Sequence, residues 1–167
     1  PTGSAVSYGG LRIHSGCPFV FNGLTVTTSK GDGSAILAKG ALSIKNSAFT
    51  ESEALGLPVS DGAGLHVMPG TTGSITLENV LLRENDGSGI WIETSGNVTF
   101  RKVQSLSNIY MGVQIETEAP GTLGAMTVNI SDSQFLKNSD TNLYVGARGA
   151  VTLTNLVASD STNKNGA

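Results

Sequence analysis

The sequence predicts an all-β fold, a solenoid of about six to seven coils built from short strands. Two observations lead to this fold class. A pair of strand-like segments recurs with a basic period of 23 residues, and no stretch has an apolar 3.6-residue periodicity long enough for a good helix. The 22 glycines recur too often for long helices, and 14% charged residues are too few for a charged disordered chain.

The first segment of each repeat has the form small residue, apolar, variable, apolar. Its starts are separated by 23, 31, 25, 23 and 30 residues: Gly10, Gly33, Gly64, Gly89, Gly112 and Asn142. Insertions within residues 51–61 and 117–125 explain most departures from the period, and repeat folds tolerate insertions at corners. We expect one domain over residues 10–167, continuing or capped beyond residue 167. Residues 1–9 are expected to form an incomplete first coil or an N-terminal cap.

The second segment alternates apolar residues and ends near Asn or Asp. It occupies residues 19–23, 42–46, 75–79, 98–102, 128–132 and 151–155. Period-two alternation with β-branched residues indicates strands that bury one face. Strands of successive coils would run parallel, ~4.8 Å apart, and parallel crossovers are overwhelmingly right-handed. The fold class is therefore a right-handed parallel β-helix.

Stacking turns each repeat position into a column along the axis. One predicted core column contains Leu11, Ile36, Val67, Ile92, Ile115 and Val145. The corner after the second strand holds Gly23, Asn46, Asn79, Lys102, Asp132 and Asn155. Gly, Asn and Asp accept left-handed backbone conformations, and stacked amides bond to each other. We expect a structural ladder of Asn46, Asn79, Asp132 and Asn155. Six residues beyond this corner comes a further polar series: Ser29, Ser52, Asn85, Asn108, Asn138 and Ser161.

The outward column of the first strand is the candidate site. It contains Arg12, Ala35, His66, Trp91, Gln114 and Tyr144. Exposed aromatic rings stack on the apolar faces of sugars while polar neighbours bind the hydroxyls. We therefore interpret His66, Trp91, Gln114 and Tyr144 as candidates for binding a glycan or another partner.

A second outward column, two residues later, brings Glu93 next to Glu116. Their backbones would lie ~4.8 Å apart, and the carboxyl groups could approach the ~5 Å separation of a retaining glycosidase. Any two neighbouring coils have this backbone spacing, however. The pair is a weak catalytic candidate, and no catalytic residue is assigned.

The repeat resembles that of the pectate-lyase-like superfamily of parallel β-helices, especially the versions found in bacterial surface proteins. The resemblance rests on segments such as "GIWI" at 89–92 and "ITLEN" at 75–79, and it covers roughly residues 10–167. This fold is shared by polysaccharide lyases, glycosidases, phage tailspikes and adhesins. The resemblance implies that an enzyme of this kind would use calcium-binding aspartates or clustered aspartates, and the candidate face has no such cluster.

Composition narrows the partners. A net charge of −3 offers no basic surface for nucleic acid, and no apolar run reaches the ~18 residues of a membrane span. We expect no cofactor and no metal site, since His14 and His66 lie several coils apart; calcium is not supported by the residues. Asn97 and Asn129 fit the N-glycosylation pattern, in agreement with an extracellular or cell-surface location.

These observations favour a non-enzymatic extracellular β-solenoid with a structural, adhesive or filament-forming role. Its expected partners are other copies of itself or further coils of a longer chain. The alternative is a carbohydrate-active β-helix, a polysaccharide lyase or glycoside hydrolase, that binds or cleaves polysaccharide along the Trp91 face. A glycan array with product assays separates the two.

Overall fold

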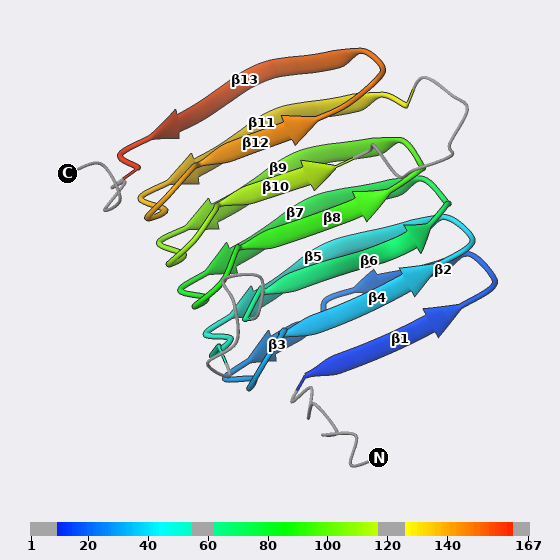
Figure 1. The fold of residues 1–167 in the computed structure, drawn as a ribbon, viewed down its shortest axis with the longest axis horizontal. Helices are drawn as coiled ribbons and strands as arrows, with labels where there is room; N and C mark the ends of the chain where they lie inside the picture. Colours follow the sequence, from blue (N-terminus) through cyan, green and yellow to red (C-terminus); the bar gives the residue numbers. More distant parts are fainter. Residues whose placement is uncertain (1–9, 55–61, 117–125, 162–167) are drawn as a thin grey trace, which may run out of the picture.

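A computed structural model describes residues 10–54, 62–116 and 126–161 as a stack of parallel strands. The predictions for residues 1–9, and for most of the two insertions, lie outside the described residues. The coils rise in chain order from β1 to β13, and these two strands lie at opposite ends of the stack (Figure 1). Every pair of neighbouring strands in the described part is parallel. The all-β prediction is confirmed.

The first strands of the coils form a six-stranded sheet in the order β1-β4-β6-β8-β10-β12. Its strands are β1 (Leu11–Ser15), β4 (Ser34–Ala38), β6 (Leu65–Thr71), β8 (Ile90–Thr94), β10 (Val113–Glu116) and β12 (Leu143–Gly146). Alternating burial, as in the sequence of β8, puts one side of this sheet on the core. The other side is the outward face of the candidate site, called here the first-strand face.

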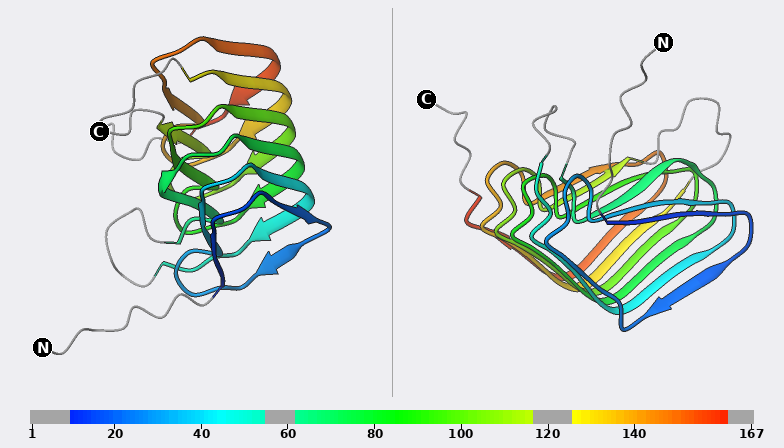
Figure 2. Two further views of the ribbon diagram at one scale, coloured as in Figure 1. Left: turned by 90° about the vertical axis from the view of Figure 1, so that its right-hand side faces the viewer. Right: turned by 90° about the horizontal axis from the view of Figure 1, so that it is seen from below.

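The second sheet contains seven strands in the order β13-β11-β9-β7-β5-β2, and β3 also pairs with β5. Its strands are β2 (Phe19–Asn22), β3 (Thr25–Thr27), β5 (Leu42–Thr50), β7 (Ile75–Arg83), β9 (Val98–Leu106), β11 (Val128–Leu136) and β13 (Val151–Ser159). From β5 onward each strand continues through the predicted corner and bends there. Figure 2 shows these bends in line from coil to coil.

The bend is made by one residue per coil in the left-handed region, with φ of 48° to 75°: Gly23, Asn46, Asn79, Lys102, Asp132 and Asn155. Five residues later a second left-handed residue turns each coil back toward the first sheet: Thr28, Glu51, Glu84, Ser107, Lys137 and Asp160. The predicted corner is therefore a single-residue bend. The second corner is marked in the sequence only by the polar residue that follows it.

The core consists of the predicted aliphatic columns. Ile36, Val67, Ile92 and Ile115 are fully buried and stack in register. The prediction was wrong for Leu11, because it pairs with Ser34 while Ile13 pairs with Ile36. The correct residue, Ile13, is two positions later in the strand. Both side chains still point inward, because side chains on one face of a strand recur every second position.

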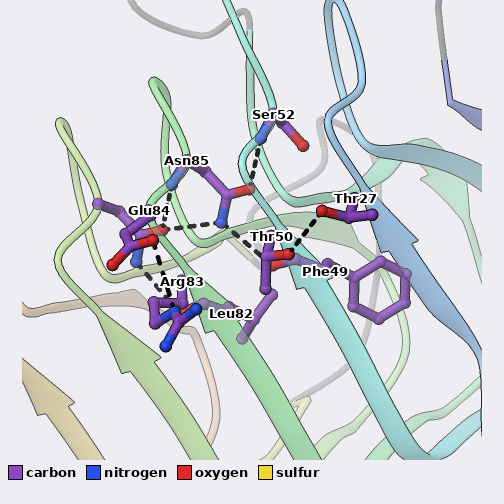
Figure 3. A network of polar contacts seen from close by, with 9 residues as sticks. Thr27, Phe49, Thr50, Ser52, Leu82, Arg83, Glu84 and Asn85 are labelled. Carbon is purple, nitrogen blue, oxygen red and sulfur yellow. Dashed lines mark hydrogen bonds and ion pairs between the residues drawn. The ribbon is translucent and has the colours of Figure 1, made fainter.

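A buried asparagine ladder closes the second corner. Asn85 Nδ2 donates to Asn108 Oδ1 at 2.8 Å, and Asn108 Nδ2 donates to Asn138 Oδ1 at 2.8 Å. Asn138 Nδ2 in turn donates to Asn142 Oδ1 at 2.7 Å. Figure 3 shows how Asn85 also binds the backbone of the preceding coil, where its Oδ1 accepts from the Ser52 amide at 3.1 Å. Each amide thereby satisfies backbone groups that the turn leaves unpaired.

Candidate functional site

The register of the first sheet aligns the predicted outward column. Successive strands pair Arg12 with Ala35, Ala35 with His66, His66 with Trp91, Trp91 with Gln114, and Gln114 with Tyr144. Glu93 pairs with Glu116 in the same way. The structure therefore brings together all six of the residues predicted for binding or catalysis: His66, Trp91, Glu93, Gln114, Glu116 and Tyr144.

The Trp91 side chain is less exposed than predicted. Its ring stacks on the imidazole of His66, with ring centroids 4.4 Å apart and planes 2° from parallel. Flat side chains on adjacent strands of one face stand at about this spacing, so the two rings stack. Both residues are half-buried, and the buried Trp91 Nε1 has no hydrogen-bond partner among the described residues. The His66 side chain is only 15% exposed.

Asp32 is a member of the site that the sequence analysis missed. This buried residue, 5% exposed, precedes β4, and its Oδ2 lies 2.8 Å from His66 Nδ1. Its Oδ1 accepts a hydrogen bond of 3.1 Å from the Ala63 amide. The carboxylate thus fixes the imidazole from the preceding coil. The sequence does mark Asp32 as unusual, because it is an acidic residue just before the repeat glycine. The later coils have Ala63, Ser88, Met111 and Thr141 in this position.

Glu93 approaches the other side of the imidazole. Its Oε2 lies 3.6 Å from His66 Nε2, a buried nitrogen that makes no hydrogen bond within the described part of the chain. Burial raises the pKa of Glu93; the charge of His66 opposes this rise, and the charge of Glu116 adds to it. A carboxyl group with a raised pKa can act as a proton donor, as a general acid does.

Glu116 and Tyr144 complete the first-strand face. Gln114 Nε2 donates to Glu116 Oε1 at 2.7 Å, so the two side chains engage each other. Tyr144 on β12 is 45% exposed. Among the described residues of this column Tyr144 is thus the aromatic ring most open to a partner.

The corner ladder of the second sheet consists of two short runs. Asn46 Nδ2 donates to Asn22 Oδ1 at 2.8 Å, and Asn79 Nδ2 donates to Asn46 Oδ1 at 2.9 Å. Farther along, Asn155 Nδ2 donates to Asp132 Oδ1 at 2.7 Å. Lys102 stands between the two runs, so the predicted ladder is interrupted by a side chain that has no amide.

Charged side chains form a row on the outer face of the second sheet. Glu78 contacts Lys45 at 3.2 Å and Arg101 at 2.8 Å. The hydrogen bond to Lys45 and the two positive charges lower the pKa of Glu78. The two glycosylation candidates are both exposed: Asn97 lies in the turn before β9 and Asn129 lies on β11.

Within residues 10–54, 62–116 and 126–161, no three His, Cys, Asp or Glu residues gather in a way that could hold a metal ion. In the same ranges there is no helix long and apolar enough to cross a membrane.

Parallel strands in stacked coils, with core columns and polar ladders in register, define a β-solenoid. The chain matches the family described as a right-handed beta helix region over residues 2–158, and it belongs to this family. The predicted right-handed parallel β-helix is confirmed. No curated protein and no solved structure matches the chain.

Proposed function

We propose that this chain is a non-enzymatic extracellular or cell-surface β-solenoid with a structural or adhesive role, in which the coils form a stiff shaft. The supporting observation is the core side of β13. Val151 and Leu153 are 44% and 48% exposed, whereas Val128 and Ile130, one coil earlier in the same columns, are 0% and 1% exposed. A further coil, from the same polypeptide or from another copy, would bury these side chains and pair the edge of β13 that has no partner strand among the described residues.

Sedimentation and particle images at increasing protein concentration test whether another copy of the chain supplies the further coil. We expect end-to-end elongation, which Leu153→Lys should abolish because it places a charge in the buried contact. Thr152→Lys is the matched control, since it changes the neighbouring residue on the opposite side of the strand. A particle that stays monodisperse at every concentration contradicts self-assembly.

Hydrogen bonds among the side chains of the first-strand face support a non-enzymatic role. Asp32 binds His66, and Gln114 binds Glu116, so most of the acid and base groups are already engaged with one another. Incubation with a panel of polysaccharides should yield neither new reducing ends nor unsaturated products. If the protein cleaves any polysaccharide and Glu93→Gln abolishes this cleavage, the result contradicts this part of the proposal.

The second candidate function is carbohydrate binding or cleavage along the first-strand face. The observation in its favour is the pair of neighbouring carboxyl groups, Glu93 and Glu116, one of which has a raised pKa. A glycan array followed by the same product assays tests it, with Trp91→Ala and Glu116→Gln as the informative variants. The absence of both binding and turnover removes this candidate.

A further inference from the structure

A groove of about 450 Å³ runs along the outer surface of the second sheet, beside the corner ladder and away from the first-strand face. Its lining comes from five successive coils, each of which contributes a side chain at or just after the bend: Thr25, Asn46, Asn79, Lys102 and Asp132. The groove therefore extends along the solenoid axis. A ligand that fits it is an elongated chain with a repeat that matches the coils.

The amide groups in the groove are held in place by the ladder. Asn79 donates one N–H to Asn46, and Asn46 donates one to Asn22, so the amides point in the same direction along the axis. An amide has two N–H groups and two acceptor positions, and the ladder uses only part of this capacity. The rest is preorganised for a ligand, which lowers the entropy lost on binding.

The rest of the lining mixes amide and apolar surface. Gln104 and Gln134 are exposed next to the bend, and Ala48 and Leu81 are half-buried in the equivalent position of the preceding coils. Polar groups that both donate and accept, beside small apolar patches, suit a ligand with hydroxyl groups on its edges and C–H groups on its faces.

Lys102 is the residue that the fold does not explain. It adopts a φ of 54°, a conformation that favours Gly or Asn, and it interrupts the ladder. Its side chain is exposed, and among the described residues no ion pair includes it. Departures from a local rule without a local gain are expected at functional sites. Asp132 in the next coil balances its charge, so the groove has no excess of either sign.

We propose that this groove binds a linear, neutral oligosaccharide with about one sugar unit per coil. Successive coils stand ~4.8 Å apart, close to the advance of one pyranose in an extended chain, whereas an extended peptide advances by ~3.3 Å per residue and falls out of phase with the coils. Lys102, Gln104 and the ladder amides bind the hydroxyl groups, and Leu81 contacts a ring face.

The test begins with an array of linear β-1,4-linked glucose, mannose and xylose oligomers. Calorimetry on the strongest binder, from dimer to hexamer, should show affinity that rises with length and levels off at about five units, because five coils line the groove. Absence of binding by all three series overturns the proposal. So does an affinity that does not depend on length.

Variants then locate the site. Gln104→Ala should weaken binding at least fivefold without a change in melting temperature, since the side chain is exposed. Lys102→Asn should also weaken binding at least fivefold, but it should raise the melting temperature because it restores the ladder. Unchanged affinity in both variants overturns the proposal. Trp91→Ala, on the first-strand face, should leave affinity unchanged, and loss of binding in Trp91→Ala alone assigns the ligand to that face and overturns the groove.

Discussion

The two asparagine columns of this protein have the same side chain but different energetic roles. Asn108 is 1% exposed, accepts from the Asn85 amide, and donates to Asn138 and to Ser105 Oγ. Asn79 is exposed and makes its ladder bond next to solvent. Water can replace the partners of the exposed residue but has no access to those of the buried one.

We therefore expect Asn108→Ala to lower the free energy of unfolding by about 3 kcal/mol, since buried groups left without a partner cost about 1–3 kcal/mol each. Asn79→Gly should cost about 1 kcal/mol or less, because glycine suits the left-handed bend. Urea unfolding measures both. Equal losses in the two variants contradict this distinction.

Glu93 makes stability depend on pH. Its pKa is raised in the folded protein, mainly by burial, so the folded state favours the protonated form. The stability that this preference provides is complete below the unfolded pKa of Glu and is lost as pH rises through the folded pKa. Glu93→Gln keeps a neutral side chain at every pH.

The melting temperature of Glu93→Gln relative to the parent protein should therefore increase between pH 4 and pH 8. Glu53→Gln, a change of an exposed glutamate, is the matched control and should give no such trend. Thermal scans at constant ionic strength measure the two differences. A relative melting temperature for Glu93→Gln that falls as pH rises contradicts the predicted sign.

At the scale of elements, the residue just before the first strand of a coil lies very close to the next coil. The space left there decides whether this residue can have a Cβ. A Cβ on Gly89 would lie 2.7 Å from the Gly112 carbonyl oxygen and 2.7 Å from Asn108 Nδ2. A Cβ on Gly16 would meet nothing within 4 Å. The repeat glycine is therefore required by close approach of the buried ladder to the backbone.

Gly89→Ala should cost about 1–3 kcal/mol, as overpacking does in a dense core, and Gly16→Ala should leave stability nearly unchanged. Denaturant midpoints of the two variants provide the comparison. A tolerated Gly89→Ala would mean that the ladder can shift, contrary to the tight contacts described above.

Element register was the most predictable part of the site. The alignment of Trp91 with Gln114 and of Glu93 with Glu116 followed from the repeat alone and is confirmed. Exposure was not predictable, because the stacking of Trp91 on His66 depends on two side chains in different coils. Asp32 was not predictable in this way, because its contact reaches from a turn to the next coil, and the two-residue alternation of a strand carries no information about turn residues.

At the scale of the whole molecule, stability should decline toward the last described coil. Ile130 is buried between coils, whereas Leu153 in the same column is 48% exposed. Ile130→Ala should therefore lower the free energy of unfolding by about 2–5 kcal/mol, and Leu153→Ala should lower it by about 1 kcal/mol, because less apolar surface is removed from contact. Unfolding curves at low protein concentration check this, and equal losses would show that another coil covers β13 in solution.

The sequence by itself determined the solenoid, because a repeat of fixed length carries the core columns, the corner residues and the register in one dimension. Only the tertiary structure decided which polar column is buried, how Asp32, His66 and Glu93 meet across three coils, and where Lys102 interrupts the ladder beside a groove. The physical reason is that a sequence repeat predicts which residues occupy the same position in successive coils and therefore stack. The contacts of Asp32, His66 and Glu93 join different positions of their coils, and the distance between such positions depends on how each coil bends.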